Sequence, residues 1–217
     1  LAGEIRMVVE LFTSQGCASC PPADKLLGEL AVRPDVLAIS LPVDYWDYIG
    51  WKDTLASPAN TKRQKAYSIA RGDRQVYTPQ AVVNGLVHVV GSNTSAIEAA
   101  AIASRGRDGA LSLGVAVVEE NGEIRVTVTP MPGVITPPGQ ILLVKLRRKC
   151  EVSIGRGENS GRVVTYSNVA QGVVPLGQFE GRQITVTLPK EKAAGEYVDG
   201  YAVIVQAGID GRPGAIL

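Results

Sequence analysis

The chain contains few of the residues from which most catalytic and metal sites are built. Its 217 residues include a single histidine, His88, and three cysteines. One histidine excludes zinc sites with several histidines, facial triads with two histidines, and the His-Glu-x-x-His pattern of metalloproteases. His88 falls in a β-rich run, where a structural histidine is the usual case, so we expect no catalytic role for it.

Strong charge of one sign and long apolar runs are also missing. The formal net charge is +1, and the longest basic run is Arg147, Arg148 and Lys149, so we expect no nucleic-acid partner. The longest apolar runs, such as residues 115–118, are far shorter than the roughly 18 residues of a spanning helix, so no membrane span is predicted. The 45% of hydrophobic residues is typical of a globular chain of one or two domains.

Two of the cysteines, Cys17 and Cys20, form a Cys-x-x-Cys pair between an apolar segment and a helix start. Such a pair suits a redox motif better than the disulfide framework of a small secreted domain. A thiol at a helix N-terminus meets unpaired backbone N–H groups and the positive end of the helix dipole. Both favour the thiolate, which is the reactive form. A plain structural disulfide is the alternative interpretation.

Periodicity predicts a βαβ unit around this pair. Residues 5–12 form an apolar strand, residues 24–32 have helical spacing, and residues 36–43 are almost continuously apolar, as in a buried parallel strand. The two prolines after Cys20 fit only a first helical turn, so the helix begins near Cys20 and Ser19 is a candidate cap. Parallel strands end at the same edge of a sheet, so the loop after Val43 should approach the cysteines.

That loop carries both tryptophans, Trp46 and Trp51, beside Tyr45. One interpretation is a small hydrophobic cluster that packs a long loop, and the other is an apolar recognition surface beside the thiols. Further on, Ser57 and Pro58 are typical of a helix start. A hairpin turn is then predicted at residues 84–85, and a capping box at residues 95–98 starts a helix to about residue 104.

This order of elements, with the segment from Tyr77 through Thr78 and Pro79 to Gly85, resembles the thioredoxin superfamily. The resemblance implies that Cys17 attacks the substrate, Cys20 resolves the mixed disulfide, and a cis-proline at Pro79, after Thr78, shapes the substrate-binding edge. It also implies protein thiols or disulfides as partners, and it brings in no cofactor and no metal.

Residues 10–17 together with residues 20–24 resemble, more narrowly, a bacterial family of predicted secreted proteins of unknown function with a thioredoxin-like first half. This resemblance implies a secreted or periplasmic location. Residue 1 is Leu rather than Met, which fits removal of a signal peptide. The oligomeric state is not predicted.

The chain also departs from thioredoxins. Gly16 stands where they have tryptophan, and Ala18 and Ser19 replace their Gly-Pro, so the direction of electron flow is not inherited. By resemblance, Glu10 on the first strand is a candidate for moving the proton of Cys20. A carboxylate paired with lysine or arginine is the alternative for Glu10.

The second half changes character, with short β-rich runs between glycine, proline and asparagine. We therefore expect an α/β thioredoxin-like fold, a mixed sheet with flanking helices, at residues 1–107, followed by an all-β sandwich-like domain of unknown role at residues 108–217. Cys150 is expected to be a buried packing thiol. Two alternatives to exchange remain open: a non-catalytic extracytoplasmic binding protein with a structural disulfide, and a Cu(I) carrier.

Overall fold

A computed structural model describes residues 4–209 and 211–217. The first half contains β1 (Met7–Thr13), α1 (Pro21–Ala31), β2 (Val36–Pro42), η1 (Asp47–Ile49), α2 (Pro58–Arg71), β3 (Gln80–Val83), β4 (Val87–Val90), α3 (Thr94–Ser104) and η2 (Arg107–Gly109). The second half contains β5 (Leu113–Glu120), β6 (Glu123–Pro130), β7 (Gly139–Ser153), β8 (Val163–Phe179), β9 (Ile184–Pro189), η3 (Lys190–Ala193), β10 (Gly200–Ile209) and β11 (Arg212–Ile216).

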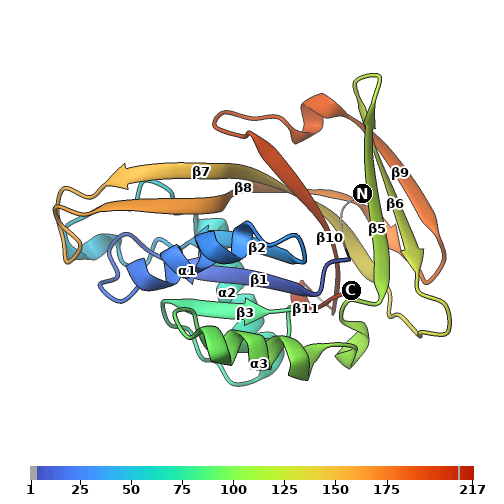
Figure 1. Cartoon of the computed structure of the whole chain (residues 1–217), viewed down its shortest axis with the longest axis horizontal. Helices are drawn as coiled ribbons and strands as arrows, with labels where there is room; N and C mark the ends of the chain where they lie inside the picture. The colour runs from blue at the N-terminus through green and yellow to red at the C-terminus, as the bar shows by residue number, and fades with distance from the viewer. Residues whose placement is uncertain (1–3, 210) are drawn as a thin grey trace.

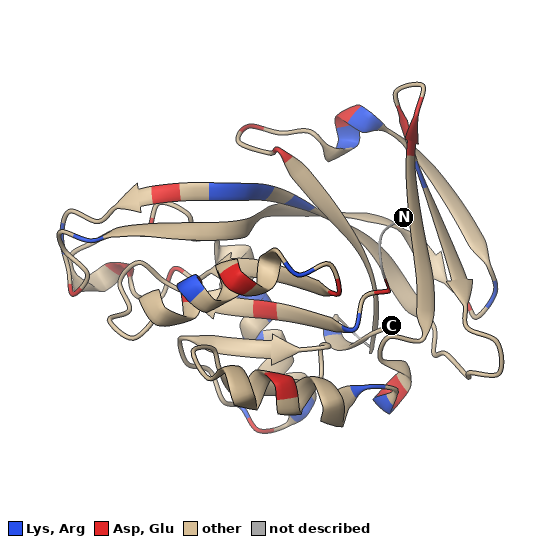
Figure 2. Ribbon diagram, viewed as in Figure 1, with Lys and Arg blue, Asp and Glu red and all other residues tan. Residues whose placement is uncertain are grey.

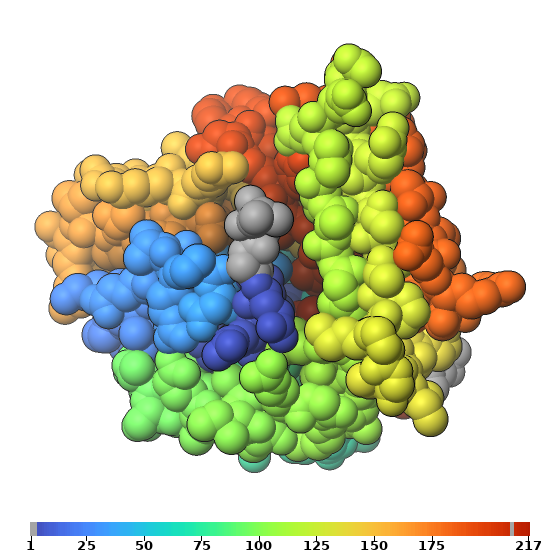
Figure 3. Space-filling model, turned by 45° about the vertical axis from the view of Figure 1, so that its right-hand side comes forward, coloured from blue at the N-terminus to red at the C-terminus, as the bar shows by residue number. Residues whose placement is uncertain are grey.

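Most strands belong to one large, curled mixed sheet. Its order is β11-β10-β7-β8-β2-β1-β3-β4, and β5, β6 and β9 form a separate three-stranded sheet (Figure 1). In the space-filling view, β5 and β9 form an upright layer on the right-hand side of the molecule (Figure 3). Acidic and basic residues are interspersed along the chain, and the longest basic stretch lies on β7 (Figure 2).

The predicted fold class, a thioredoxin-like α/β fold followed by an all-β sandwich-like domain, is wrong. The described chain is mostly β, and strands of both halves share the eight-stranded sheet because β8 lies against the free edge of β2. Their parallel pairing is limited to Ser40 and Val169, and Asn168 adds a side-chain hydrogen bond to the Ala38 carbonyl at 2.9 Å. The predicted boundary after residue 107 falls in η2, and as a division into two domains it stays a prediction.

Several predicted elements of the first half are present, with differences at their ends. Ser57 caps α2 as predicted, its hydroxyl accepting from the Ala59 N–H at 3.2 Å. The turn between β3 and β4 has Asn84 and Gly85 at positive φ (50° and 74°), as a type I′ turn requires. α3 begins instead after Asn93, whose side chain accepts from Ala96.

The two faces of β1 decide which residues can reach the cysteines. Val9 and Leu11 pack with Leu27 of α1 in one core, whereas Val8 and Phe12 pack with Tyr67 of α2 in another. The alternation follows from the pleat of a strand, which sends successive side chains to opposite faces. Odd-numbered residues of β1 therefore face α1, and even-numbered residues face α2.

Candidate functional site

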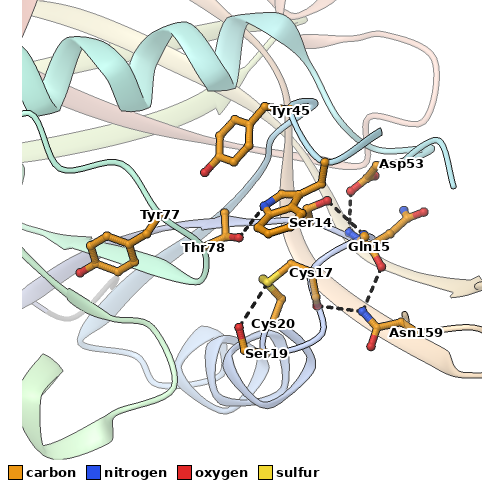
Figure 4. Close-up of a disulfide and its surroundings, with 12 residues drawn as sticks. Ser14, Gln15, Cys17, Ser19, Cys20, Tyr45, Asp53, Tyr77, Thr78 and Asn159 are labelled. Atoms are coloured by element: carbon orange, nitrogen blue, oxygen red, sulfur yellow. Dashed lines mark hydrogen bonds between the residues drawn. A yellow bond between two sulfur atoms is a disulfide. The ribbon is translucent and has the colours of Figure 1, made fainter. Parts of the chain in front are cut away.

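Cys17 and Cys20 form a disulfide between the end of β1 and the start of α1, with Cα atoms 5.4 Å apart (Figure 4). Cys20 is the N-cap residue of α1 and has helical φ and ψ, and prolines fill the first turn behind it. Ser19 does not cap the helix, and its hydroxyl lies 3.5 Å from Cys17 Sγ. Both cysteines are buried, at 2% and 0% exposure, while Ala18 and Ser19 between them are exposed.

The segment after η1 holds the cysteine loop from one side. The backbone N–H of Gln15 donates to Asp53 Oδ2 at 2.8 Å, and Trp51 Nε1 donates to Gln15 Oε1 at 2.8 Å. Burial raises the pKa of Asp53, and the N–H groups of Gln15 and Leu55 oppose that shift. The loop therefore depends on a buried carboxyl and a tryptophan that lie far from it in sequence.

The loop between β7 and β8 holds the cysteine loop from another side. Asn159, which is 1% exposed, donates from Nδ2 to the carbonyl oxygens of Gln15 at 3.0 Å and Cys17 at 2.8 Å (Figure 4). The ring of Trp51 lies against the same loop, because a Cβ added to Gly155 would lie 3.2 Å from its Cζ3. The second half of the chain thus covers the disulfide.

Replacing Asn159 by alanine should loosen this cover. The Gln15 carbonyl would lose its Asn159 donor, and the Cys17 carbonyl would keep only the Cys20 N–H. We therefore expect a loss of about 1–3 kcal/mol in unfolding free energy and a severalfold faster opening of the disulfide by dithiothreitol. Urea unfolding and stopped-time alkylation measure the two effects. Glu158→Ala, at the exposed neighbouring position, is the control and should change the unfolding free energy by less than about 0.5 kcal/mol. Equal opening rates in the two variants would contradict a covering role for Asn159.

Three of the predicted substrate-binding residues, Trp46, Thr78 and Pro79, lie on the other side of the disulfide. Trp46 Nε1 donates to Thr78 Oγ1 at 2.8 Å, and a Cβ added to Gly16 would lie 3.1 Å from Trp46 Cβ, so Trp46 joins the cysteine loop to the Thr78 segment. The peptide bond before Pro79 is cis, as the resemblance implied, and Pro79 is buried. Figure 4 shows Thr78 and Asn159 on opposite sides of the cysteines.

Tyr45 and Trp51 lie farther from this edge. The Tyr45 hydroxyl donates to Gln64 Oε1 of α2 at 3.1 Å, and Trp51 is held by Gln15 as described. The three aromatic residues of the loop that were predicted to bind substrate, Tyr45, Trp46 and Trp51, are half-buried. They pack and hydrogen-bond neighbouring segments, which is the structural role that the first interpretation predicted. Their role in recognition stays a prediction.

The structure does not bring Glu10 to the cysteines. Its side chain is on the α2 face of β1, where Arg63 Nε donates to Glu10 Oε1 at 2.6 Å and the Tyr67 hydroxyl donates to Glu10 Oε2. This ion pair is the arrangement that the alternative interpretation predicted. The pleat of the strand explains the placement, since Thr13, not Glu10, faces α1 at this end of β1.

Asp24 is the buried acid that the sequence analysis missed. It lies one helical turn after Cys20, donates its backbone N–H to the Cys20 carbonyl, and is 2% exposed. Among the described residues, neither carboxyl oxygen has a hydrogen-bond partner. Burial raises the pKa of Asp24 to about 8; the nearby Thr13 hydroxyl opposes the shift and Asp53 adds to it. The available signal was spacing, because Asp24 shares a helix face with Cys20 and Leu27.

The described residues contain no group of three or more His, Cys, Asp or Glu side chains that could hold a metal ion. In the same part of the chain, no helix combines the length and the apolar character needed to cross a membrane. Cys150 is buried and unpaired.

The comparisons with known proteins identify a family. A family model described as a protein of unknown function (DUF1223) matches residues 8–206. The crystal structure of a protein from Agrobacterium tumefaciens is similar, with 35% identity and a TM-score of 0.87, over 100% of this chain and 93% of that one. No curated protein matches. The chain belongs to the DUF1223 family of proteins of unknown function.

Proposed function

We propose that this chain exchanges disulfides with protein thiols through Cys17 and Cys20, in a secreted or periplasmic location. The observation that carries the proposal is Asp24, a buried carboxyl without a hydrogen-bond partner among the described residues, one helical turn after Cys20. Exchange at Cys20 requires a proton to be given and taken, whereas a structural disulfide requires no acid beside it. An oxidising compartment is also where disulfides persist.

The oxidised chain would react in two steps. A partner thiolate attacks the sulfur of Cys17, the Cys17–Cys20 bond breaks, and Cys20 leaves as a thiolate that takes the proton of Asp24. A second thiolate of the partner then attacks the partner sulfur of the mixed disulfide and releases Cys17 as a thiolate. The partner gains a disulfide and the chain gains two electrons. In the reverse direction, ionised Asp24 accepts the proton of Cys20.

Access to Cys17 depends on the segments that cover it. The exposed residues Ala18 and Ser19 mark the side from which a partner would approach, next to Trp46 and Thr78. Because Cys17 is only 2% exposed, exchange requires one of the covering groups to move.

A structural disulfide is the second candidate, and the burial of both cysteines favours it. It would fit a non-catalytic binding protein in which the pair holds the turn between β1 and α1. The two functions differ in the reduction potential of the pair and in what removing Cys17 does.

A glutathione redox titration of the Cys17–Cys20 pair tests the proposal. It is best made in a Cys150→Ser background, so that the buried third thiol does not contribute. We expect a potential between roughly −120 and −270 mV, the range of working exchange catalysts. A potential below about −300 mV would mark a structural bridge and overturn the proposal. Cys17→Ala should abolish exchange with glutathione disulfide and keep the fold, whereas a large stability loss alone would support the structural candidate.

A further inference from the structure

A cavity of about 790 Å³ lies between α2 and the curled sheet, on the face of β1 opposite the disulfide. We call it the α2 cavity. Its volume is within the range of about 300–1,000 Å³ that is usual for small-molecule sites. Its inner wall consists of apolar side chains from four strands, including Ile39, Leu41, Val144 and Ile204. The chain's own side chains leave this space unfilled where β8 meets β2 through one residue pair.

Two cations line this cavity. Arg147 lies over the ring of Tyr197 at 5.1 Å and shares the cavity with Glu151, whereas Arg63 lies where the cavity meets a second hollow. Arg63 uses Nε for Glu10, and Nη2 for Tyr67 and Gln206 at 3.0 and 2.8 Å. None of the hydrogen bonds of Arg63 to the described residues uses its third nitrogen, Nη1, and the side chain is 21% exposed. The floor of the apolar cavity thus presents one uncommitted guanidinium nitrogen.

A second hollow, of about 600 Å³, continues from the α2 cavity and shares Ala59, Arg63 and Leu142 with it. We call it the basic groove. Lys62 and Arg212 line it, and no acidic residue does among residues 4–209 and 211–217, which the structure describes. Glu10 neutralises Arg63, so the net positive charge of the groove comes from Lys62 and Arg212, which are both exposed. The α2 cavity therefore opens directly into the basic groove.

We propose that these two hollows form a binding site for a single-chain amphiphile with a carboxylate head, of the fatty-acid class. The acyl chain occupies the α2 cavity, and the carboxylate lies in the basic groove between Lys62 and Arg212, within reach of Arg63 Nη1. This placement of the acyl chain and the carboxylate rests on the distribution of charge along the site. Among the described lining residues, the α2 cavity balances two cations, Arg63 and Arg147, against Glu10 and Glu151. The basic groove adds Lys62 and Arg212 without an acid, so the net positive charge lies at one end, and a ligand needs an apolar part and an anionic end in that order.

Titration calorimetry of the oxidised full chain with dodecanoate, below its micellar concentration, tests the proposal. We expect saturable 1:1 binding. Dodecanol, which lacks the charge, should bind at least about tenfold more weakly, because two cations each lose a modest electrostatic interaction. Butanoate should bind more than about a thousandfold more weakly, because eight methylene groups are missing. Absence of saturable dodecanoate binding would overturn the proposal.

Variants locate the site. Ala59→Trp fills the junction of both hollows from an exposed position on α2 and should weaken dodecanoate binding at least tenfold. Ala70→Trp, at an exposed position of the same helix that lines neither hollow, is the matched control and should bind normally. Thermal melting confirms that both are folded. Equal binding by the two variants would place the ligand elsewhere and overturn the assignment.

The head group is tested separately. Replacing Lys62 and Arg212 together by glutamine should weaken dodecanoate binding about tenfold and leave dodecanol binding within about twofold. An equal change for both ligands, or no change for either, would show that the basic groove does not bind the carboxylate. None of these measurements depends on exchange at Cys17 and Cys20, so the two proposals succeed or fail independently.

Discussion

Replacing Asp24 by asparagine is expected to abolish most of the fall in unfolding free energy that the oxidised chain shows as pH rises from 5 to 9. Asp24 is buried, and its pKa is raised from 3.8 to about 8 in the folded chain, mainly by burial. In the unfolded chain the carboxyl is exposed and ionises near pH 4. Between these two values the folded chain holds a proton that the unfolded chain releases.

The direction of the effect follows from this difference in bound protons. Because the folded chain binds the extra proton, the free energy of unfolding falls as pH rises through this window and levels off above pH 8. The stabilisation is complete only below about pH 4. Since a tenfold change in the ionisation constant is worth about 1.4 kcal/mol, the fall due to Asp24 between pH 5 and pH 9 is on the order of 4 kcal/mol.

Urea unfolding of wild type and Asp24→Asn at pH 5 and pH 9 measures this difference. Asparagine stays neutral, so the variant should show a much smaller fall, whatever its stability at pH 5. Asp108→Asn, at an exposed position, is the matched control and should fall as the wild type does. An unchanged fall in Asp24→Asn would assign the titration to another buried acid, such as Asp53, whose pKa burial also raises.

The same variant bears on the proposed exchange. If Asp24 supplies the proton of Cys20, Asp24→Asn should slow the reaction of the oxidised chain with dithiothreitol and remove an inflection near pH 8 from its rate profile. A slower rate with an unchanged profile would indicate that the side chain acts only through packing.

The first half shows what local pattern can predict. The β-rich run, the Cys-x-x-Cys and the helical spacing after it correctly placed β1, α1 and β2, because short-range periodicity reflects which residues face a core. Ser57 and the turn at Asn84 were predictable from local chemistry alone. These signals depend on residues a few positions apart.

The partner of β2 was not predictable in this way. A near-continuous apolar strand shows that both faces are buried, but it does not show which strand occupies its second edge. Val169 of β8, more than a hundred residues away, takes that edge through a single pair. β8 also contains Gly172, Pro175 and Gly177, which interrupt the strand pattern, so its 17 residues looked like shorter pieces.

Some residues of the candidate site were likewise predictable from local sequence, and others were not. Cys17, Cys20 and the cis bond before Pro79 follow from local sequence and from the resemblance. Asn159 could not be predicted, because its two hydrogen bonds join loops separated by more than 140 residues. Glu10 was the reasonable candidate for a buried acid, but sequence order alone did not say which face of β1 would carry Arg63.

Replacing Arg63 by methionine is expected to destabilise the chain by about 3–5 kcal/mol at pH 7, because it leaves the carboxylate of Glu10 buried without its cation. The Glu10 side chain is only 3% exposed, so water makes up only part of the lost interaction. Glu10→Gln should cost less, since Arg63 is 21% exposed and keeps its bonds to Tyr67 and Gln206. The urea unfolding free energies of these variants measure the effect.

The double variant Glu10→Gln with Arg63→Met separates the ion pair from packing. With no charge left buried, it should recover much of the loss caused by Arg63→Met alone, which makes the two substitutions non-additive. A loss below about 1 kcal/mol in Arg63→Met, or simple additivity in the double variant, would show that Arg63 acts mainly through its apolar stem.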